Sequence, residues 1–226
     1  MTLQETNLET ESSLTKTKFG IPIDYSFSKP ASEESIKLAL DSLTRNGFEV
    51  KVVDTAVDAR VLLEKILPQD KTIFTSSSET LRISGLEEEI NGANSRFKSL
   101  RQELAKMDFN TQFRQMVKMG AVPDVVVGSV HAVTESGSVL IASGSGSQIA
   151  PYVTGAEKVF WVVGSQKIVK DLETGLRRIE LYSLPLEDIR MHEVRNKGSA
   201  VGKILIVNRD TLGRTSIVLI REPIGF

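Results

Sequence analysis

The sequence predicts an α/β fold in which a mainly parallel sheet is covered by helices. Segments of helical periodicity alternate with short apolar strands along residues 32–78, which is the pattern of a parallel sheet with helical crossovers. Residues 158–164, KVFWVVG, form a continuous apolar run, as a strand buried on both faces does. A chain of 226 residues, 40% of them hydrophobic, is long enough for one sizeable core.

The first predicted elements are two helices on either side of a strand. Ser32 is a good N-cap for the first helix, and the Asn46-Gly47 pair ends it. Residues 48–54 follow as a strand, after which Thr55 starts a second helix that ends before Pro68. The apolar positions of the first helix recur at helical spacing: Ile36, Ala39, Leu40 and Leu43.

The middle of the chain is predicted to be mostly helical. Residues 71–78 form a short strand that runs into three serines. From Glu79 to Met119 the sequence contains a short helix ended by Asn91-Gly92, followed by charged amphipathic segments. The charges of these segments indicate solvated helix faces.

The second half is predicted to return to strands. Residues 123–147 are rich in Val, Ser and Gly and indicate closely spaced strands, broken at Gly128 and at Ser136-Gly137. A helix follows over residues 171–194, and two strands around residues 211–213 end the chain. The expected inner face of the helix over residues 171–194 consists of Leu172, Leu176, Ile179 and Leu186.

Domain organisation is predicted to be simple. We expect a loosely ordered N-terminal tail over residues 1–28 and a single domain over residues 29–226. The first twenty residues lack the basic and apolar regions of a signal peptide, and no apolar window is long enough to span a membrane. We therefore expect a cytoplasmic protein.

Composition excludes several classes of function. The 28 basic and 29 acidic residues give a net charge of −1, so nothing in the overall charge favours binding to nucleic acid or to an anionic membrane. The absence of cysteine excludes disulfides, a cysteine nucleophile, cysteine-ligated zinc and an iron–sulfur cluster on this chain. The only histidines, His131 and His192, argue against a metal site with several histidines.

Polar residues follow two of the predicted strands at positions where α/β proteins bind ligands. Ser76, Ser77 and Ser78 follow one strand and precede a helix, so they either hold a phosphate or carboxylate or only cap that helix. Lys167 follows the apolar run 158–164, where it could supply the counter-charge for an anion.

A glycine- and serine-rich stretch lies between two apolar runs, and its six residues are Ser143, Gly144, Ser145, Gly146, Ser147 and Gln148. Glycines let the backbone adopt positive φ and approach a ligand, and exposed N–H groups can then surround an anion. The stretch is not a nucleotide P-loop, because no Lys-Ser/Thr pair follows it. It is therefore either a ligand-binding loop or a linker.

Glu135 precedes a turn between two apolar strands. Its carboxylate is a candidate acid, base or nucleophile, and the alternative is that it anchors nearby backbone N–H groups. In a regular strand His131 would lie on the same face as Glu135, although a strand histidine is more often a structural residue.

Three long segments resemble the LUD-domain family, the lactate-utilisation C-type proteins. They are VVVGSVHAVTESGSVLIASGSGSQIAPYVTGAEKVFWVVGSQKIV, LETGLRRIELYSLPLEDIRM and NRDTLGRTSIVLIREPIGF. The resemblance covers roughly residues 30–226 and implies a Rossmann-like fold of the NagB/RpiA/CoA-transferase type. Some members of the family work with iron–sulfur partner proteins in lactate oxidation, and the wider superfamily binds sugar phosphates, CoA thioesters and folates.

The resemblance bears on Glu135 in part. CoA-transferase members of the superfamily use the glutamate of a Glu-Asn-Gly turn as nucleophile, whereas this chain has Glu135-Ser136-Gly137. Because Ser136 departs from that motif, the resemblance implies only that Glu135 lies near the ligand site.

Two hypotheses about function follow. In the first, the chain is an enzyme or enzyme subunit that binds a small anionic metabolite through residues 143–148, 76–78 and Lys167, with Glu135 as acid or base. In the second, it is a non-catalytic metabolite sensor or an assembly subunit of a redox complex. An iron–sulfur partner protein is implied by the resemblance, a homodimer is compatible with the apolar strands, and we expect neither nucleic acid nor membrane as a partner.

Overall fold

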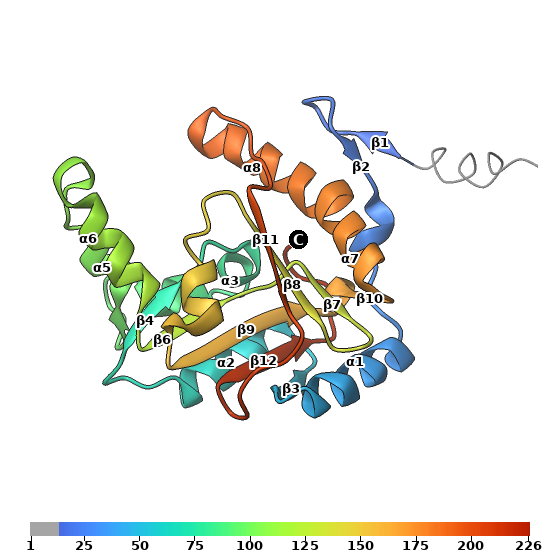
Figure 1. Ribbon diagram of the computed structural model, residues 1–226, viewed down its shortest axis with the longest axis horizontal. Coiled ribbons are helices and arrows are strands. Elements are labelled where there is room, and N and C mark those ends of the chain that lie inside the picture. The colour runs from blue at the N-terminus through green and yellow to red at the C-terminus, as the bar shows by residue number, and fades with distance from the viewer. Residues whose placement is uncertain (1–13) are drawn as a thin grey trace, which may run out of the picture.

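The computed structural model describes residues 14–226 (Figure 1). Residues 1–13 of the predicted tail lie outside the described part. The rest of that segment has regular structure: β1 (Thr15–Lys16) pairs antiparallel with β2 (Pro22–Ile23), and the 3-10 helix η2 (Tyr25–Ser28) follows. Ile23 is fully buried, so this short hairpin is attached to the rest of the fold.

A six-stranded sheet forms the centre of the molecule, and all of its neighbouring strands are parallel. In spatial order its strands are β3 (Glu49–Val53), β12 (Thr215–Ile220), β9 (Lys158–Gly164), β6 (Val125–Gly128), β4 (Thr72–Thr75) and β5 (Lys98–Ser99). This confirms the predicted α/β fold with a parallel, Rossmann-like sheet. The apolar run 158–164 is the β9 strand, and it lies between β12 and β6.

Helices cover one face of this sheet. They are α2 (Ala56–Ile66), α3 (Glu79–Ile83) and α4 (Leu86–Asn91). Alternate strand residues such as Phe160 and Val162 pack against helix residues such as Leu63 and Leu81. Thr55 starts α2, as predicted, and forms a capping box with Asp58.

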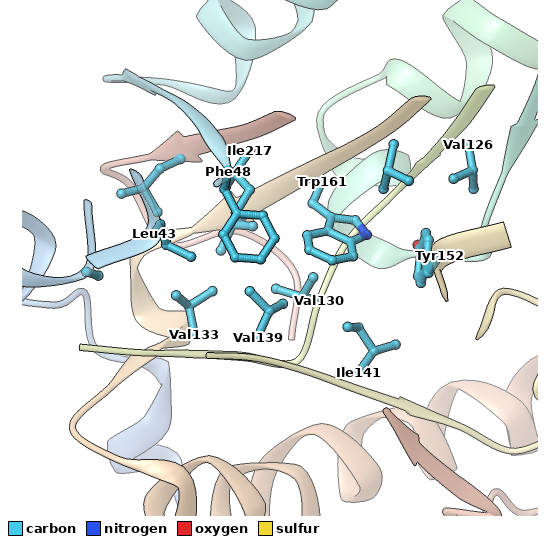
Figure 2. Close-up of a cluster of buried hydrophobic side chains, with 14 of the residues drawn as sticks. Leu43, Phe48, Val126, Val130, Val133, Val139, Ile141, Tyr152, Trp161 and Ile217 are labelled. Carbon is cyan, nitrogen blue, oxygen red and sulfur yellow. The ribbon is translucent and has the colours of Figure 1, made fainter. Parts of the chain in front are cut away.

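A second, four-stranded sheet packs over the other face of the large sheet. Its order is β10 (Ile168–Val169), β7 (Ala132–Thr134), β8 (Val139–Ser143) and β11 (Lys203–Val207). Figure 2 shows the apolar layer between the two sheets, in which Trp161 and Phe48 lie opposite Val133, Val139 and Ile141. The two C-terminal strands were predicted correctly, but β11 and β12 belong to different sheets and do not pair with each other.

Further helices lie around the two sheets. They are α1 (Glu33–Arg45), α5 (Leu100–Leu104), α6 (Phe109–Ala121), α7 (Leu172–Arg178) and α8 (Leu184–Arg195), together with the 3-10 helix η4 (Ser165–Lys167) and the π-helices η3 (Pro151–Gly155) and η5 (Ile179–Ser183). No helix within residues 14–226 has the length and apolar character needed to cross a membrane.

The face that α7 buries differs from the predicted one. Ile179 is buried, but Leu172 is 42% exposed and Leu176 is 37% exposed. The helix instead turns Gly175 and Arg178 inward. A Cβ atom at Gly175 would lie 2.9 Å from Leu140 of β8, so this face of the helix is chosen by close packing against the small sheet.

Candidate functional site

The carboxyl ends of three neighbouring parallel strands carry the polar segments that the sequence singled out. The order β9-β6-β4 places the ends of these strands side by side. Residues 76–78 follow β4, Ser129 follows β6, and Lys167 follows β9 within η4. Lys167 thus lies at the edge where open parallel sheets bind ligands, and ligand binding by it stays a prediction.

Lys167 lies at the centre of this edge and is only 1% exposed. Its Nζ is 2.9 Å from Thr80 Oγ1 on α3 and 2.9 Å from Ser129 Oγ. Burial and the nearby charge of Arg178 lower the pKa of Lys167 well below its usual value. Both effects act against the charged amine, because each makes a positive charge at this position less favourable.

Arg178 is fully buried, and its partners are neutral oxygens. The guanidinium donates to the Gln166 carbonyl, the His131 carbonyl and Ser183 Oγ. Its Nη2 has no hydrogen-bond partner within residues 14–226. Burial lowers the pKa of Arg178 to about 10, so the group keeps its charge at neutral pH.

His131 joins this group from the start of β7. Its Nδ1 accepts a hydrogen bond of 3.1 Å from the backbone N–H of Ala142. Burial, the charge that Lys167 carries when protonated and the charge of Arg178 lower the pKa of His131 to about 3, so the ring is neutral at neutral pH. We refer to Thr80, Ser129, His131, Lys167 and Arg178 as the Lys167 cluster.

The three serines after β4 have three different roles. Ser76 Oγ lies 2.9 Å from Tyr152 Oη in a buried contact. Ser77 Oγ accepts a hydrogen bond of 3.2 Å from Arg101 Nη2. Ser78 caps α3, which is the alternative role that the sequence left open.

The 143–148 loop begins beside the Lys167 cluster, because Ala142 donates to His131 and directly precedes Ser143. Its side chains bond mainly within the loop. Ser143 Oγ accepts from the Gly146 N–H at 2.8 Å and donates to Gln148 Oε1 at 2.9 Å. Gly146 has a φ of +90°, the left-handed conformation for which glycine was expected. Ligand binding by this loop stays a prediction.

Glu135 has a different environment from the Lys167 cluster. It follows β7, whereas His131 precedes it, so the two residues lie at opposite ends of that strand. Glu135 Oε1 accepts a hydrogen bond of 2.7 Å from Ser35 Oγ on α1. No hydrogen bond or ion pair between described residues joins Glu135 to the Lys167 cluster.

Sequence reasoning missed Thr80, Ser129 and Arg178 as members of the site. The position of Ser129 directly after a strand was a usable signal. Gly128 carried another signal, a glycine at a strand end where the chain is closely packed. A Cβ atom there would lie 1.8 Å from Tyr152 Oη and 2.2 Å from Ser76 Oγ. Arg178 carried no local signal, since an arginine on a charged helix is ordinarily exposed.

One surface hollow lies away from the Lys167 cluster. A depression of about 320 Å³ lies between η3 and β11, lined by residues that include Tyr152, Leu205 and Arg214. Arg214 donates to the carbonyls of Pro151 and Tyr152 and therefore holds η3 in place. Within residues 14–226, no three His, Asp or Glu side chains gather in a way that could hold a metal ion.

Comparison with known proteins decides the family. The profile of the LUD domain matches residues 36–200. The chain belongs to the LUD-domain family. No curated protein sequence matches this LUD-domain chain.

Two solved structures are similar to this LUD-domain protein. One is a DUF162 family protein from Deinococcus radiodurans, with 11% sequence identity, 84% of this chain and 99% of that chain covered, and a TM-score of 0.49. The other is eIF2B beta from Chaetomium thermophilum, with 14% identity, 62% of this chain and 46% of that chain covered, and a TM-score of 0.30.

Proposed function

We propose that this LUD-domain protein binds a small anionic metabolite at the carboxyl edge of its large sheet, beside Ser129 and Lys167. The observation that carries this proposal is the environment of Arg178. Its guanidinium is fully buried, bonds only to neutral oxygens and leaves Nη2 without a partner among the described residues. The Tyr182 ring, whose centroid is 5.0 Å from Arg178 Cζ, offsets part of the cost of this charge. A buried charge without a carboxylate partner is still costly, and a bound anion nearby would offset that cost.

Ser129 offers the route to this site from solvent. It is half-buried and directly contacts the Lys167 amine. Its hydroxyl, the amine and the field of Arg178 together favour a carboxylate or a phosphate. Hydroxy acids, which the family's link to lactate utilisation suggests, therefore head the candidate ligands, followed by sugar phosphates, CoA esters and folates.

Thermal-shift measurements with these four classes of anion test the proposal. A ligand at 100 times its Kd stabilises the protein by about 2.7 kcal/mol. We expect Ser129→Ala to weaken this response. The control Ser26→Ala alters an exposed serine on η2 and should keep the full response. If no class of anion shifts the melting temperature, the proposal is wrong.

A second candidate function, an assembly subunit, is favoured by α6. None of its thirteen residues is buried, and its apolar ridge includes Phe109 at 63%, Phe113 at 52% and Val117 at 41% exposure. The helix extends from one side of the molecule (Figure 1). Isolated helices of this length are marginal in water without packing on an apolar face. A partner protein, such as the iron–sulfur protein implied by the family or a second copy of the chain, would supply that packing.

Size measurement and capture from native cells test the assembly role. Phe113→Glu places a charge on the apolar ridge of α6 and should abolish any complex that the native chain forms. Thr111→Glu introduces the same charge at another exposed position of the helix and should leave the complex intact. A native chain that stays monomeric and captures no partner would contradict the assembly role.

A further inference from the structure

We propose that Ser129 and Lys167 form a serine–lysine catalytic dyad that hydrolyses esters or thioesters of small anionic acyl compounds. This inference rests on the anion site proposed above and assigns a reaction to it. Ser129 is the nucleophile, Lys167 is the general base, and Thr80 is a positioning residue.

The geometry meets the requirements for an activated serine. Ser129 Oγ lies 2.9 Å from Lys167 Nζ, within reach for direct proton transfer. Ser129 is half-buried, so part of the residue is open to solvent, whereas Lys167 is 1% exposed and shielded from water. Ser-Lys variants of the catalytic triad pair a serine nucleophile with a lysine base.

Thr80 fixes the base from its other side. Thr80 Oγ1 is 2.9 Å from Lys167 Nζ, and its own hydroxyl donates to the Ile224 carbonyl at 3.3 Å. The amine is therefore held between two hydroxyl oxygens that come from α3 and from the end of β6. In triads built on histidine, a third group orients the base in the same way.

The charges around Lys167 favour the free amine that a general base requires. No salt bridge among the described residues includes Lys167, and its hydrogen-bond partners are hydroxyl groups. A carboxylate partner would hold a lysine in its protonated form. Burial and Arg178 act in the opposite direction and lower the pKa of Lys167. The other ionisable group beside it, His131, is neutral.

The Ser129 hydroxyl also donates to the Val162 carbonyl at 2.7 Å. This bond holds Oγ in place while the hydrogen points away from Lys167. Rotation of the hydroxyl hydrogen about the Cβ–Oγ bond directs it to the amine without moving the oxygen. The nucleophile is therefore already positioned, and activation requires only this rotation.

The reaction balances without any group beyond the substrate and water. Ser129 Oγ attacks the acyl carbon, its proton passes to Lys167, and the bond from that carbon to the leaving oxygen or sulfur breaks. Lys167 gives the proton to the leaving alcohol or thiol. Water then attacks the acyl-serine ester, Lys167 takes a proton from the water, and that proton returns to Ser129 Oγ as the acid is released.

Labelling of the full chain with a fluorophosphonate tests the dyad directly. The probe forms a bond from Ser129 Oγ to phosphorus and releases fluoride, and peptide mass spectrometry identifies the modified residue. We expect one adduct, on Ser129, and none in Ser129→Ala. Lys167→Met should slow labelling at least about 100-fold, the usual contribution of a general base. Ser26→Ala should label at the native rate.

Two further measurements test the dyad even if the Ser129 and Lys167 variants do not fold. The labelling rate of the native chain should rise with pH as Lys167 loses its proton. Thr80→Val keeps the shape of the side chain but removes the oxygen that holds the amine, so it should move this pH profile. Native protein that is not labelled on Ser129, or labelling that is equally fast in a folded Lys167→Met variant, would overturn the dyad.

Turnover links the dyad to the anion site. The acyl probe 4-nitrophenyl hydrogen succinate carries a carboxylate, and 4-nitrophenyl acetate does not. We expect nitrophenol release that depends on Ser129 and is at least 10-fold faster for the succinate. Anion binding without an adduct on Ser129 would reject the dyad and leave the proposed function standing. An adduct and equal turnover of both esters, with no thermal shift, would reject the anion site instead.

Discussion

The Lys167 cluster and the 143–148 loop are both rich in polar groups near the carboxyl edge of the large sheet, yet they are built in different ways. The cluster draws its five residues from four segments of the chain, and both its lysine and its arginine are buried. The loop bonds mainly to itself, as the contacts of Ser143 with Gly146 and Gln148 show. The two regions meet where Ala142 donates to His131.

This difference separates two kinds of polar segment that look alike in composition. A loop whose hydroxyls satisfy its own backbone is stable without a ligand. A cluster that holds charge away from water without carboxylate partners depends on its surroundings for stability. The perturbed pKa values of its groups are typical of functional sites. The cluster is therefore the better candidate for function.

The largest expected effect is a loss of stability in acid that depends on His131. Its pKa is about 3 in the fold against 6.5 ordinarily, so below pH 6.5 the unfolded chain binds a proton that the folded chain does not. The contribution is fully present above pH 6.5 and is lost as the pH falls towards 3, by about 1.4 kcal/mol per unit and about 5 kcal/mol in total.

Denaturant unfolding between pH 7 and pH 4 measures this loss. His131→Asn keeps an acceptor for the Ala142 N–H and should flatten the dependence on pH. Ser147→Ala in the loop should retain the native dependence. An equal loss of stability in native protein and His131→Asn would contradict the assigned role of His131.

A pair of glycine substitutions compares the packing of the two regions. Gly128→Ala would place a Cβ atom 1.8 Å from Tyr152 Oη, and such overpacking costs about 1–3 kcal/mol. Gly144→Ala in the loop meets only the Ala200 carbonyl, at 3.3 Å, and should cost less than about 1 kcal/mol. Urea unfolding measures both values, and a larger cost at Gly144 would reverse the comparison.

A pair of serine substitutions tests the hydrogen bonds in the same way. Ser76→Ala removes a buried contact of 2.9 Å with Tyr152 Oη and should lower the free energy of unfolding by about 1–2 kcal/mol. Ser145→Ala in the exposed part of the loop should change it by less than about 0.5 kcal/mol. Equal effects would show that the loop is packed as firmly as the buried edge.

The smallest expected effect is at Glu135. Glu135→Gln can still accept from Ser35 Oγ, so we expect less than about 0.5 kcal/mol of destabilisation. Because Glu135 lies at the far end of β7 from His131, we also expect the rate of labelling at Ser129 to stay within about two-fold. A fall of about 100-fold in the rate of labelling at Ser129 would instead identify Glu135 as the acid or base.

Much of the fold was predictable because the sequence signals for its helices and strands are local. Ser32 and Thr55 each cap a helix within three residues of their own position, and the apolar run of β9 reports burial on both faces. The second sheet was not predicted as a separate layer. Its strands β8 and β11 are about sixty residues apart along the chain, and local periodicity does not say which distant strand is the partner.

The candidate site was predictable to a smaller extent. Lys167 and the serines after β4 were found because they follow strands. Arg178 was missed because the face that α7 buries is set by contact with the small sheet. The predicted inner residues Leu172 and Leu176 are therefore exposed, while Gly175 packs against Leu140.

By itself, the sequence determined the α/β class, the family and the strand ends where polar groups would gather, because these depend on periodicity, capping and motifs within short segments. Only the tertiary structure decided which of those groups meet. Lys167 contacts Thr80 and Ser129, which are 87 and 38 residues away, while Glu135 turns to Ser35. The pairing of strands brings such groups together, and pairing is a property of the whole fold.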